Sequence, residues 1–353
     1  MYTGSRHGKV VRVLGGMTPD PPDYARRILY EYAHLNLGDP ESYPELLEAW
    51  SWVVGFTSRA SLGRDYHGLV TSGGTESNIL AAYASRLRGA RRILFFETAH
   101  YSVAKAAALL GLEAVRLPVL NGYEPDLGAL EKAVWEDSLV VATLGNTFTG
   151  YLDPVQEIAR IAGKAGASIH VDAAFAGIIA RSLGVEIRLD KTIRTFSTDL
   201  HKIPEAPIGV GVLLTYDEDT LRNLWFKAPY IPSGRQPGLL GTRPGAPLLA
   251  AKALLERMGV EGLKRLGHEL MKTTRAIYEE LVEKGPYKAP HEPQTPIICL
   301  IPPNLGKVLA RLERMGYKAY TCRPLFEGIR LVVMPHILQE VDKLVKILRE
   351  AVG

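Results

Sequence analysis

The sequence has little cysteine and no long hydrophobic segment. Cys299 and Cys322 are its two cysteines, so it has neither a disulfide framework nor a Cys-x-x-Cys metal motif. No apolar run approaches the roughly 20 residues that span a bilayer. The N-terminal stretch MYTGSRHGKVVRVLGGM also lacks the apolar segment of a signal peptide. We therefore expect a cytoplasmic protein without a metal site.

The sequence also lacks a strong charge of either sign. Its formal net charge is +4 over 353 residues, and no block of lysine and arginine stands out. Charge therefore gives no support to nucleic-acid or membrane binding. What is present is an ordinary globular composition, with 46% hydrophobic and 23% charged residues. A chain of this length buries enough apolar surface to fold without cross-links, and it is long enough for two domains.

Short apolar runs alternate with helix-like segments from residue 68 onwards. HGLVTS precedes TESNILAAYASRLRG, RRILFFE precedes YSVAKAAALLG, and SLVVATLG precedes DPVQEIARIAGKAG. SIHVDAAF, TIRTFST and GVGVLLTY then follow as three further strand-like runs. The apolar runs are continuous, as expected for strands that are covered on both faces. The pattern predicts an α/β domain with a mainly parallel sheet.

Three regions of the chain differ in composition and in the pattern of apolar residues. Residues 1–45 are rich in proline and tyrosine, and we expect an N-terminal arm with one short helix. Residues 46–250 carry the strand–helix alternation and form the predicted large domain. Residues 251–353 form a predicted smaller α/β domain, which follows a long helical stretch that Gly259 and Gly262 are expected to interrupt.

Three features carry candidate chemistry. TSGGTESN (71–78) places two glycines between a strand and a helix, where backbone N–H groups and the helix dipole favour a phosphate. Taken alone, a plain turn with Thr75 as the helix N-cap is the more common explanation. Asp172 ends the apolar strand SIHVD, where open α/β sheets place ligands, although it could instead cap the next helix. Lys202, in STDLHK, lies between two buried strands, where lost solvation favours the neutral, nucleophilic amine.

Together these features match the needs of pyridoxal 5′-phosphate. The glycine turn takes the phosphate, the acid keeps the pyridine nitrogen protonated, and the lysine holds the aldehyde. Each feature is modest alone, and their combination in this order is specific.

Residues 34–338 resemble the fold-type I pyridoxal-phosphate enzymes, which have a PLP-dependent transferase-like fold. Within that group the chain is similar to the group II amino-acid decarboxylases, particularly the archaeal tyrosine/aspartate decarboxylases. The matching stretches are NLGDP (36–40), TSGGTESN (71–78), HYSVAKAAALLG (100–111), GNTFTGYLDP (145–154), HVDAAFAG (170–177), STDLHK (197–202), LLGTRPGA (239–246) and IRLVVMPH (329–336). The resemblance implies a mainly parallel seven-stranded sheet in the large domain, and a homodimer with shared active sites.

The resemblance also implies cofactor contacts, residue by residue. Lys202 would form the internal aldimine, and Asp172 would pair with the pyridinium nitrogen. His100 would stack on the ring face opposite Ala174, although without its surrounding pattern a packed histidine with no role would be the more common explanation. The other implied contacts are those of Gly74, Thr75 and His201 with the phosphate, of Thr147 with the ring hydroxyl region, and of Thr242 with the phosphate of the neighbouring subunit.

Two further residues are expected to act on the substrate. Arg330 would bind the α-carboxylate, because a guanidinium binds a carboxylate bidentately; a surface arginine is the alternative. Tyr230, on a segment rich in proline and glycine, would protonate the product; a packed loop aromatic is the alternative. Two positions depart from the family pattern, Asn146 where GTT is frequent and Pro244 in GTRPG, which removes one backbone donor.

The implied reaction is decarboxylation of an L-amino acid through a Schiff base and a quinonoid. L-Aspartate (to β-alanine) and L-tyrosine (to tyramine) are both candidate substrates. An aspartate pocket needs a second cation, for which Arg235, Arg243 and Lys105 are candidates, whereas a tyrosine pocket needs apolar walls. One alternative is a cysteine desulfurase or other sulfur-transfer enzyme that uses Cys322, although a buried cysteine is the plainer explanation for that residue. The other is a cofactor-binding protein that has lost catalysis. The sequence assigns no role to Asp199.

Overall fold

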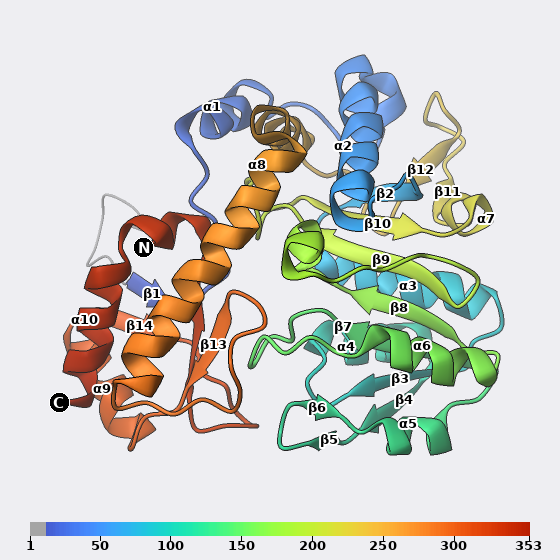
Figure 1. The fold of residues 1–353 in the computed structure, drawn as a ribbon. Helices are drawn as coiled ribbons and strands as arrows, with labels where there is room; N and C mark the ends of the chain where they lie inside the picture. Colours follow the sequence, from blue (N-terminus) through green and yellow to red (C-terminus); the bar gives the residue numbers. More distant parts are fainter. Residues whose placement is uncertain (1–11) are drawn as a thin grey trace.

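The computed structural model describes residues 12–353, so the first 11 residues of the predicted N-terminal arm lie outside it. Seven strands form the central sheet, in the order β2-β10-β9-β8-β7-β3-β4 (Figure 1). They are β2 (His67–Thr71), β3 (Arg92–Phe96), β4 (Glu113–Leu117), β7 (Ser138–Thr143), β8 (Ser168–Asp172), β9 (Ile193–Asp199) and β10 (Gly211–Thr215). Strand β10 runs antiparallel to both neighbours, and all other pairs are parallel. The predicted α/β class and mainly parallel sheet are confirmed.

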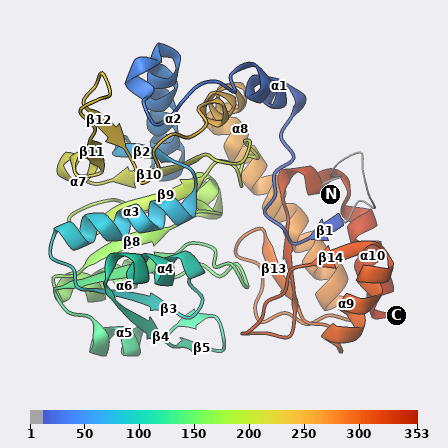
Figure 2. The same ribbon diagram turned by 180° about the vertical axis from the view of Figure 1, so that it is seen from behind.

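Helices cover both faces of this sheet, which is why its inner strands are largely buried, whereas the edge strand β4 is mostly exposed. Helices α3 (Gly74–Leu87) and α4 (Tyr101–Leu110) lie on the face that Figure 2 presents. The other face is covered by α2 (Pro44–Leu62), α6 (Val155–Lys164) and the 3₁₀ segment η2 (Gly177–Leu183), as Figure 1 shows. All six residues of β7 are buried. The smaller elements of this part are α1 (Asp23–Glu31), η1 (Pro40–Ser42), β5 (Val119–Leu120), β6 (Glu124–Pro125), α5 (Leu127–Ala133), α7 (Glu218–Arg222), β11 (Trp225–Lys227) and β12 (Arg235–Pro237).

Helix α8 (Ala246–Tyr278) leads from the sheet to the C-terminal part of the chain (Figure 1). Gly259 interrupts it with φ 62° and ψ 176°, a left-handed conformation that glycine adopts without steric cost. Gly262 lies in the helical continuation, so the expected interruption is correct for Gly259 and wrong for Gly262. The domain boundary that we propose, between residues 250 and 251, falls inside this helix.

The C-terminal part contains a strand that sequence analysis did not predict. Strand β1 (Arg12–Leu14), from the N-terminal arm, pairs in parallel with β14 (Tyr317–Ala319). Gly15 then turns with φ 76°, and a Cβ there would lie 1.8 Å from the carbonyl oxygen of Arg330. The remaining elements are η3 (Glu279–Glu283), β13 (Ile297–Leu300), α9 (Leu305–Arg314), β15 (Ile329–Val332), η4 (Pro335–Gln339) and α10 (Val341–Val352), with β13 and β15 antiparallel.

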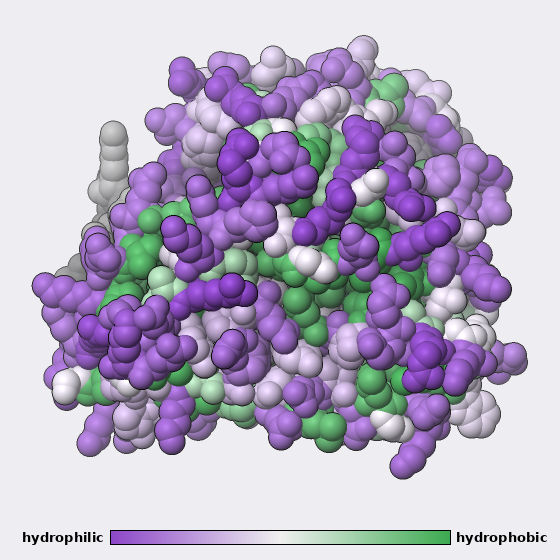
Figure 3. Space-filling view, viewed as in Figure 1, coloured by the Kyte–Doolittle hydropathy of each residue, from purple (hydrophilic) through white to green (hydrophobic). Residues whose placement is uncertain are grey.

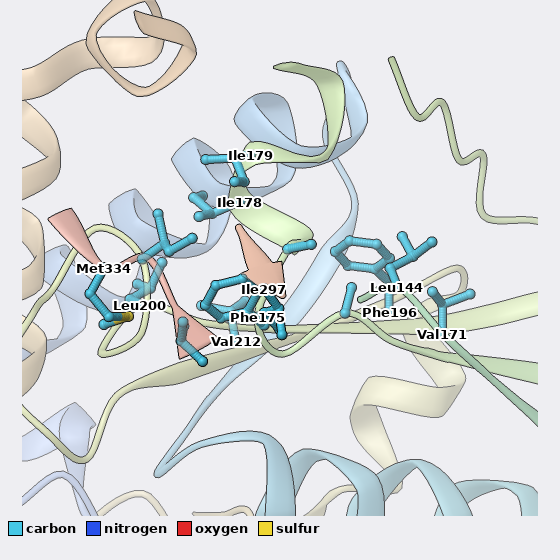
Figure 4. Packing of buried hydrophobic residues seen from close by; sticks show 14 of the residues in the cluster. Leu144, Val171, Phe175, Ile178, Ile179, Phe196, Leu200, Val212, Ile297 and Met334 are labelled. Carbon is cyan, nitrogen blue, oxygen red and sulfur yellow. The ribbon is translucent and has the colours of Figure 1, made fainter. Parts of the chain in front are cut away.

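The hydrophobic core continues from the sheet into the C-terminal part. Phe175 of the sheet region lies close to Ile297, and Leu200 lies close to Met334 (Figure 4); all four are at most 3% exposed. The surface in Figure 3 is mainly hydrophilic, with scattered apolar patches. Among the helices of residues 12–353, none has the length and apolar character needed to cross a membrane.

Candidate active site

A cavity of about 310 Å³ opens where β7, β8 and β9 end. Thr143, Asp172 and Asp199, the last residues of these strands, all line it. The carboxyl ends of parallel strands are where open α/β sheets bind ligands. The cavity brings together eight predicted residues: Gly74, Thr75, His100, Thr147, Asp172, Ala174, His201 and Lys202.

The turn before α3 forms the cradle expected for a phosphate. Gly73 is the helix N-cap, with φ 137° and no capping side chain, so the alternative in which Thr75 caps the helix is wrong. A Cβ on Gly73 would lie 2.8 Å from His201 Cε1, and one on Gly74 would lie 2.9 Å from Ala174 Cβ. Only glycine fits both positions, so backbone N–H groups at the helix start border the cavity, as an anion requires.

Lys202 is paired with a carboxylate that sequence analysis left without a role. Its Nζ lies 3.0 Å from Asp199 Oδ2, and the Asp199 side chain is 2% exposed. Burial alone would raise the pKa of Asp199, but the charges of Lys202 and His201 outweigh burial and lower that pKa. Sequence analysis considered only the lost solvation of Lys202, and the structure adds a buried carboxylate beside its amine.

Asp172 is fixed by a hydrogen bond to each carboxylate oxygen. Oδ1 accepts from the N–H of Ala174 at 3.1 Å, and Oδ2 accepts from Asn78 Nδ2 at 2.8 Å. Asn78 was not predicted as a site residue, although it lies four residues after Gly74 and therefore on the same face of α3. The signal available in the sequence was the position of Asn78, one helical turn after the glycine turn.

His100 lies at the other side of the cavity, as the N-cap of α4. Its Nδ1 lies 2.8 Å from Ser102 Oγ, and its ring centroid lies 4.3 Å from that of Tyr101. Burial lowers the pKa of His100; the charge of Asp172 acts in the opposite direction and Lys202 lowers it further. The imidazole is therefore predominantly neutral at neutral pH.

Arg330 is held rigidly beside the cavity without lining it. Its Nη1 donates to Thr147 Oγ1 at 2.9 Å, and its Nη2 and Nε donate to the carbonyl of Gly15 at 2.9 and 3.2 Å. The guanidinium carbon lies 4.8 Å from the ring centroid of Tyr320. The hydrogen bonds that hold the guanidinium go to the neutral groups of Gly15 and Thr147.

Besides Arg330, two predicted residues do not line the cavity of their own chain. Tyr230 is 85% exposed, and Thr242 is exposed in the segment before α8. Their expected roles remain predictions. Asn146, whose role was open, shapes a turn: its Oδ1 accepts from the N–H groups of Phe148 and Thr149 at 3.1 and 2.8 Å.

The three candidates for a second substrate cation are occupied elsewhere. Arg235 pairs with Glu41 at 2.7 Å. Arg243 is buried and donates to the carbonyls of Pro237, Leu240 and Val70, and Lys105 lies over the Tyr101 ring at 5.1 Å. None of the three lines the cavity.

Neither cysteine lies in the cavity. Cys322 is fully buried, and its hydrogen bond with Cys299, together with burial, raises the pKa of the Cys299 thiol. A persulfide carrier needs an accessible thiolate, so Cys322 does not support sulfur transfer. Within residues 12–353, no three His, Cys, Asp or Glu side chains are grouped to hold a metal ion.

The residues of the cavity fit pyridoxal phosphate. The glycine cradle at a helix N-terminus suits the phosphate, and Lys202 and Asp172 supply the amine and the buried carboxylate. The cavity volume lies within the range of small-ligand sites, about 300 to 1,000 Å³. Met17 and Ile208 also line it, and neither was predicted.

Comparison with known proteins gives consistent matches. The family model described as "Pyridoxal-dependent decarboxylase conserved domain" matches residues 90–301. The probable L-tyrosine/L-aspartate decarboxylase of Methanopyrus kandleri is 32% identical over 360 residues, covering 97% of this chain and 96% of that protein. The L-aspartate/L-glutamate decarboxylase of Pyrococcus horikoshii is 31% identical over 357 residues, covering 97% and 92%.

Solved structures show the same fold. A glutamate decarboxylase of Lactobacillus brevis superposes with a TM-score of 0.86 at 17% identity, covering 98% of this chain and 89% of that chain. A sphingosine-1-phosphate lyase of Burkholderia pseudomallei gives a TM-score of 0.85 at 22% identity, covering 97% and 85%.

Proposed function

Because the chain belongs to the pyridoxal-dependent decarboxylase family and is a pyridoxal-phosphate-dependent amino-acid decarboxylase, we propose that it removes the α-carboxyl group of L-aspartate to give β-alanine. The observation that carries the proposal is the meeting of Lys202, Asp172 and the Gly73–Gly74 cradle in one cavity. Aspartate is named for the relatives from both M. kandleri and P. horikoshii.

Each residue of the cavity has a defined task in this proposal. Lys202 Nζ would hold the aldehyde carbon of the cofactor. Asp172, fixed by its two hydrogen bonds, holds a proton on the ring nitrogen. When bound, the cofactor supplies an electron sink for the electron pair that carbon dioxide leaves behind. Gly74 and Thr75 bind the phosphate, together with His201.

Arg330 orients the substrate in the same proposal. Its bonds to Gly15 and Thr147 order the guanidinium before a ligand arrives, which reduces the entropy lost on binding. The positive charge of the guanidinium attracts the α-carboxylate. Thr147 then acts chiefly by holding Arg330, since its hydroxyl accepts from that guanidinium.

L-Tyrosine is the second candidate substrate, and a specific observation favours it. Met17, Tyr101 and Ile208 give the cavity an apolar wall, and this chain brings no second cation to it from Arg235 or Lys105. An apolar wall suits an aromatic side chain. Substrate choice is therefore the part of the proposal that an assay must decide.

The experiment is to incubate the cofactor-loaded protein with the twenty amino acids and to identify the amines by mass spectrometry. We expect β-alanine as the main product, with tyramine marking the second candidate. Lys202→Ala, loaded with the same cofactor, is expected to abolish the product. Wild-type rates in Lys202→Ala would contradict the role of that lysine, and no amine from any amino acid would contradict the function.

A cytoplasmic homodimer is part of the same proposal. Thr242 and Tyr230 are exposed on their own chain, which supports contacts with a neighbouring subunit. Light scattering on the purified protein should give about twice the 38.7 kDa of one chain. In a mixed dimer of Lys202→Ala and Thr242→Ala chains, shared sites should leave one site with both residues intact and one site with neither. Separate sites should instead leave one site without Lys202 and one without Thr242.

A further inference from the structure

A chain of buried hydrogen bonds joins the two sides of the cavity. It runs from Asp172 on β8 through Asn78 on α3 and Ser102 on α4 to His100. Asn78 Nδ2 lies 2.8 Å from Asp172 Oδ2 and 2.8 Å from Ser102 Oγ, and Ser102 Oγ lies 2.8 Å from His100 Nδ1. Asn78 and Ser102 are 3% and 0% exposed, so water does not compete for these bonds.

The orientation of the Asn78 amide follows from its partners. A carboxylate only accepts hydrogen bonds, so the atom of Asn78 that faces Asp172 must be the donor Nδ2. Both hydrogens of Nδ2 are then used, one on Asp172 and one on Ser102. The remaining Oδ1 accepts from His170 Nε2 at 2.8 Å. An amide turned the other way would place two acceptors face to face.

His170 supports this orientation from behind. Its Nε2 must carry the proton, because Asn78 Oδ1 can only accept, and its Nδ1 lies 2.9 Å from Thr195 Oγ1. Burial lowers the pKa of His170 to about 4, so the ring is neutral and holds one proton. That proton is on Nε2, and Asn78 is fixed from three sides.

The same logic sets the tautomer of His100. Ser102 Oγ accepts from Asn78, so its own hydrogen is free to point at His100 Nδ1, and the Ser102 N–H also points there at 3.4 Å. Nδ1 is thus an acceptor, and the single proton of the neutral imidazole lies on Nε2. Among residues 12–353, no side chain or backbone group bonds that Nε2.

We propose that Asn78 is a positioning residue that sets the proton positions on both sides of the cofactor, holding Asp172 as an acceptor and His100 as the Nε2–H tautomer. His100 then presents a donor, at Nε2, to whatever lies in the cavity. The consequence for turnover rests on the proposed function: a donor on His100 can hold the substrate's departing carboxylate, whereas an acceptor there would repel it.

The experiment measures the tautomer directly. Nitrogen-15 spectra of the full-length protein, with labelled histidine and without cofactor, separate protonated from unprotonated ring nitrogens, and a His100→Gln variant assigns the signals. Wild-type protein is expected to show Nε2–H for His100. Ser102→Ala removes one link and is expected to yield a mixture of both tautomers. Ser102→Thr, which keeps the hydroxyl, is expected to restore Nε2–H.

Ser58→Ala is the matched control. Ser58 is also a fully buried serine, and its Oγ donates to the Arg64 carbonyl at 2.7 Å and accepts from the Tyr66 N–H at 2.9 Å, away from the cavity. It should leave the His100 tautomer unchanged. In the cofactor-loaded enzyme, Ser102→Ala should lower kcat about tenfold with little change in KM, as the loss of one buried hydrogen bond predicts, and Ser58→Ala should not.

Asn78→Leu tests the proposed centre of the network. Leucine has a similar shape but no donor, so the variant should lose the hydrogen bonds to both Asp172 and Ser102. It should mix the His100 tautomers and also shift the pH dependence of the bound cofactor's absorption band. Ser102→Ala should mix the tautomers without shifting the pH dependence of that band. If Asn78→Leu does not fold, the Ser102 pair still tests the link between the network and the His100 tautomer.

Two results would overturn the proposal: Nδ1–H on His100 in the wild type, or an unchanged tautomer in Ser102→Ala. Equal kcat losses in Ser102→Ala and Ser58→Ala would overturn its catalytic part. If the tautomers are as expected but no amine product forms, the proposed function is contradicted, whereas the positioning role of the network is not.

Discussion

Asp153 is a buried carboxylate whose replacement should change the pH dependence of stability. It is 4% exposed, and its Oδ2 accepts from the N–H of Thr143 at 2.7 Å. Its Oδ1 is buried and has no hydrogen-bond partner within the described residues. Burial raises the pKa of Asp153 from 3.8 to about 7; the Thr143 N–H acts against this, and the charge of Asp172 adds to it.

The sign and size of the effect follow from this raised pKa. The native state keeps the proton up to about pH 7, whereas the unfolded state loses it near 3.8. The stability contributed by Asp153 is therefore complete below pH 3.8 and is lost as the pH rises to about 7. At about 1.4 kcal/mol per pH unit, this loss amounts to about 4 kcal/mol.

Asp153→Asn removes the titration and keeps the shape. The asparagine oxygen can still accept from Thr143, but the amide nitrogen replaces Oδ1 and gains a buried donor, at a constant cost of about 1 to 3 kcal/mol. The variant should be less stable than the wild type at pH 4 and more stable at pH 8. The difference in unfolding free energy should change by about 4 kcal/mol between these values.

The assay is guanidinium chloride unfolding of cofactor-free wild type and variant from pH 4 to pH 8, because a charged ligand beside Asp172 would alter the field at Asp153. Asp217→Asn is the control of opposite sign. Burial would raise the pKa of Asp217, but hydrogen bonds from Thr220 and the charge of Arg88 outweigh it and lower that pKa. The control should therefore cost a nearly constant amount of stability from pH 4 to pH 8, and this cost should shrink only as the pH falls below 4. A flat difference for Asp153→Asn would refute the reasoning.

Three further predictions concern the cradle, the substrate cation and the link between the two parts of the chain. Gly74→Ala places a Cβ 2.9 Å from Ala174 Cβ; we expect at least about tenfold weaker binding of pyridoxal phosphate, measured by absorbance titration, since overpacking costs about 1 to 3 kcal/mol. Arg330→Lys keeps the charge and loses the planar fork, so KM should rise by about one order of magnitude with a smaller change in kcat, and an unchanged KM in steady-state kinetics would remove Arg330 from substrate binding. His336→Gln leaves Glu205, which hydrogen bonds to His336 Nδ1, buried without its partner, and should cost about 3 kcal/mol at pH 8 in denaturant unfolding. Burial raises the pKa of Glu205, so this cost should shrink towards pH 5, and an equal cost at both values would count against the pairing.

Most of the sheet was predictable because its inner strands, such as β7, are buried on both faces. A strand that is covered on both faces needs apolar residues at successive positions, as in SLVVATLG. It therefore appears in the sequence as a continuous apolar run. The antiparallel position of β10 between β2 and β9 was not predictable in this way. It depends on which strands meet in space, and the apolar pattern of β10 does not differ from that of its parallel neighbours.

The N-terminal strand was missed because its stability comes from its partner. Strand β1 is three residues long and pairs with β14, about 300 positions later in the chain. A segment this short has no periodicity to detect. Its consequence for the site is considerable, since it places the Gly15 carbonyl where it orders Arg330.

The chemistry of the site was more predictable than its hydrogen bonding. Lys202, Asp172 and the glycine turn stand at strand ends, and residue type at a strand end is visible in sequence. Asn78 and Ser102 act through partners on separate helices and a strand. Their side chains are common in helices as surface residues, so only the packed structure shows that both are buried and bonded.

Lys202 shows which part of a physical argument sequence can supply. The inference that Lys202 loses solvation is consistent with the structure, because its side chain is only 20% exposed. The inference omitted the opposing effect, since a carboxylate 3.0 Å away offsets the desolvation cost of the ammonium. Asp199 is three residues before Lys202 in the sequence STDLHK. The chain turns after β9, which ends at Asp199, and this turn brings the amine of Lys202 next to the Asp199 carboxylate. Burial can be inferred from the pattern of one strand, whereas the balance between burial and charge requires knowing which side chains face each other.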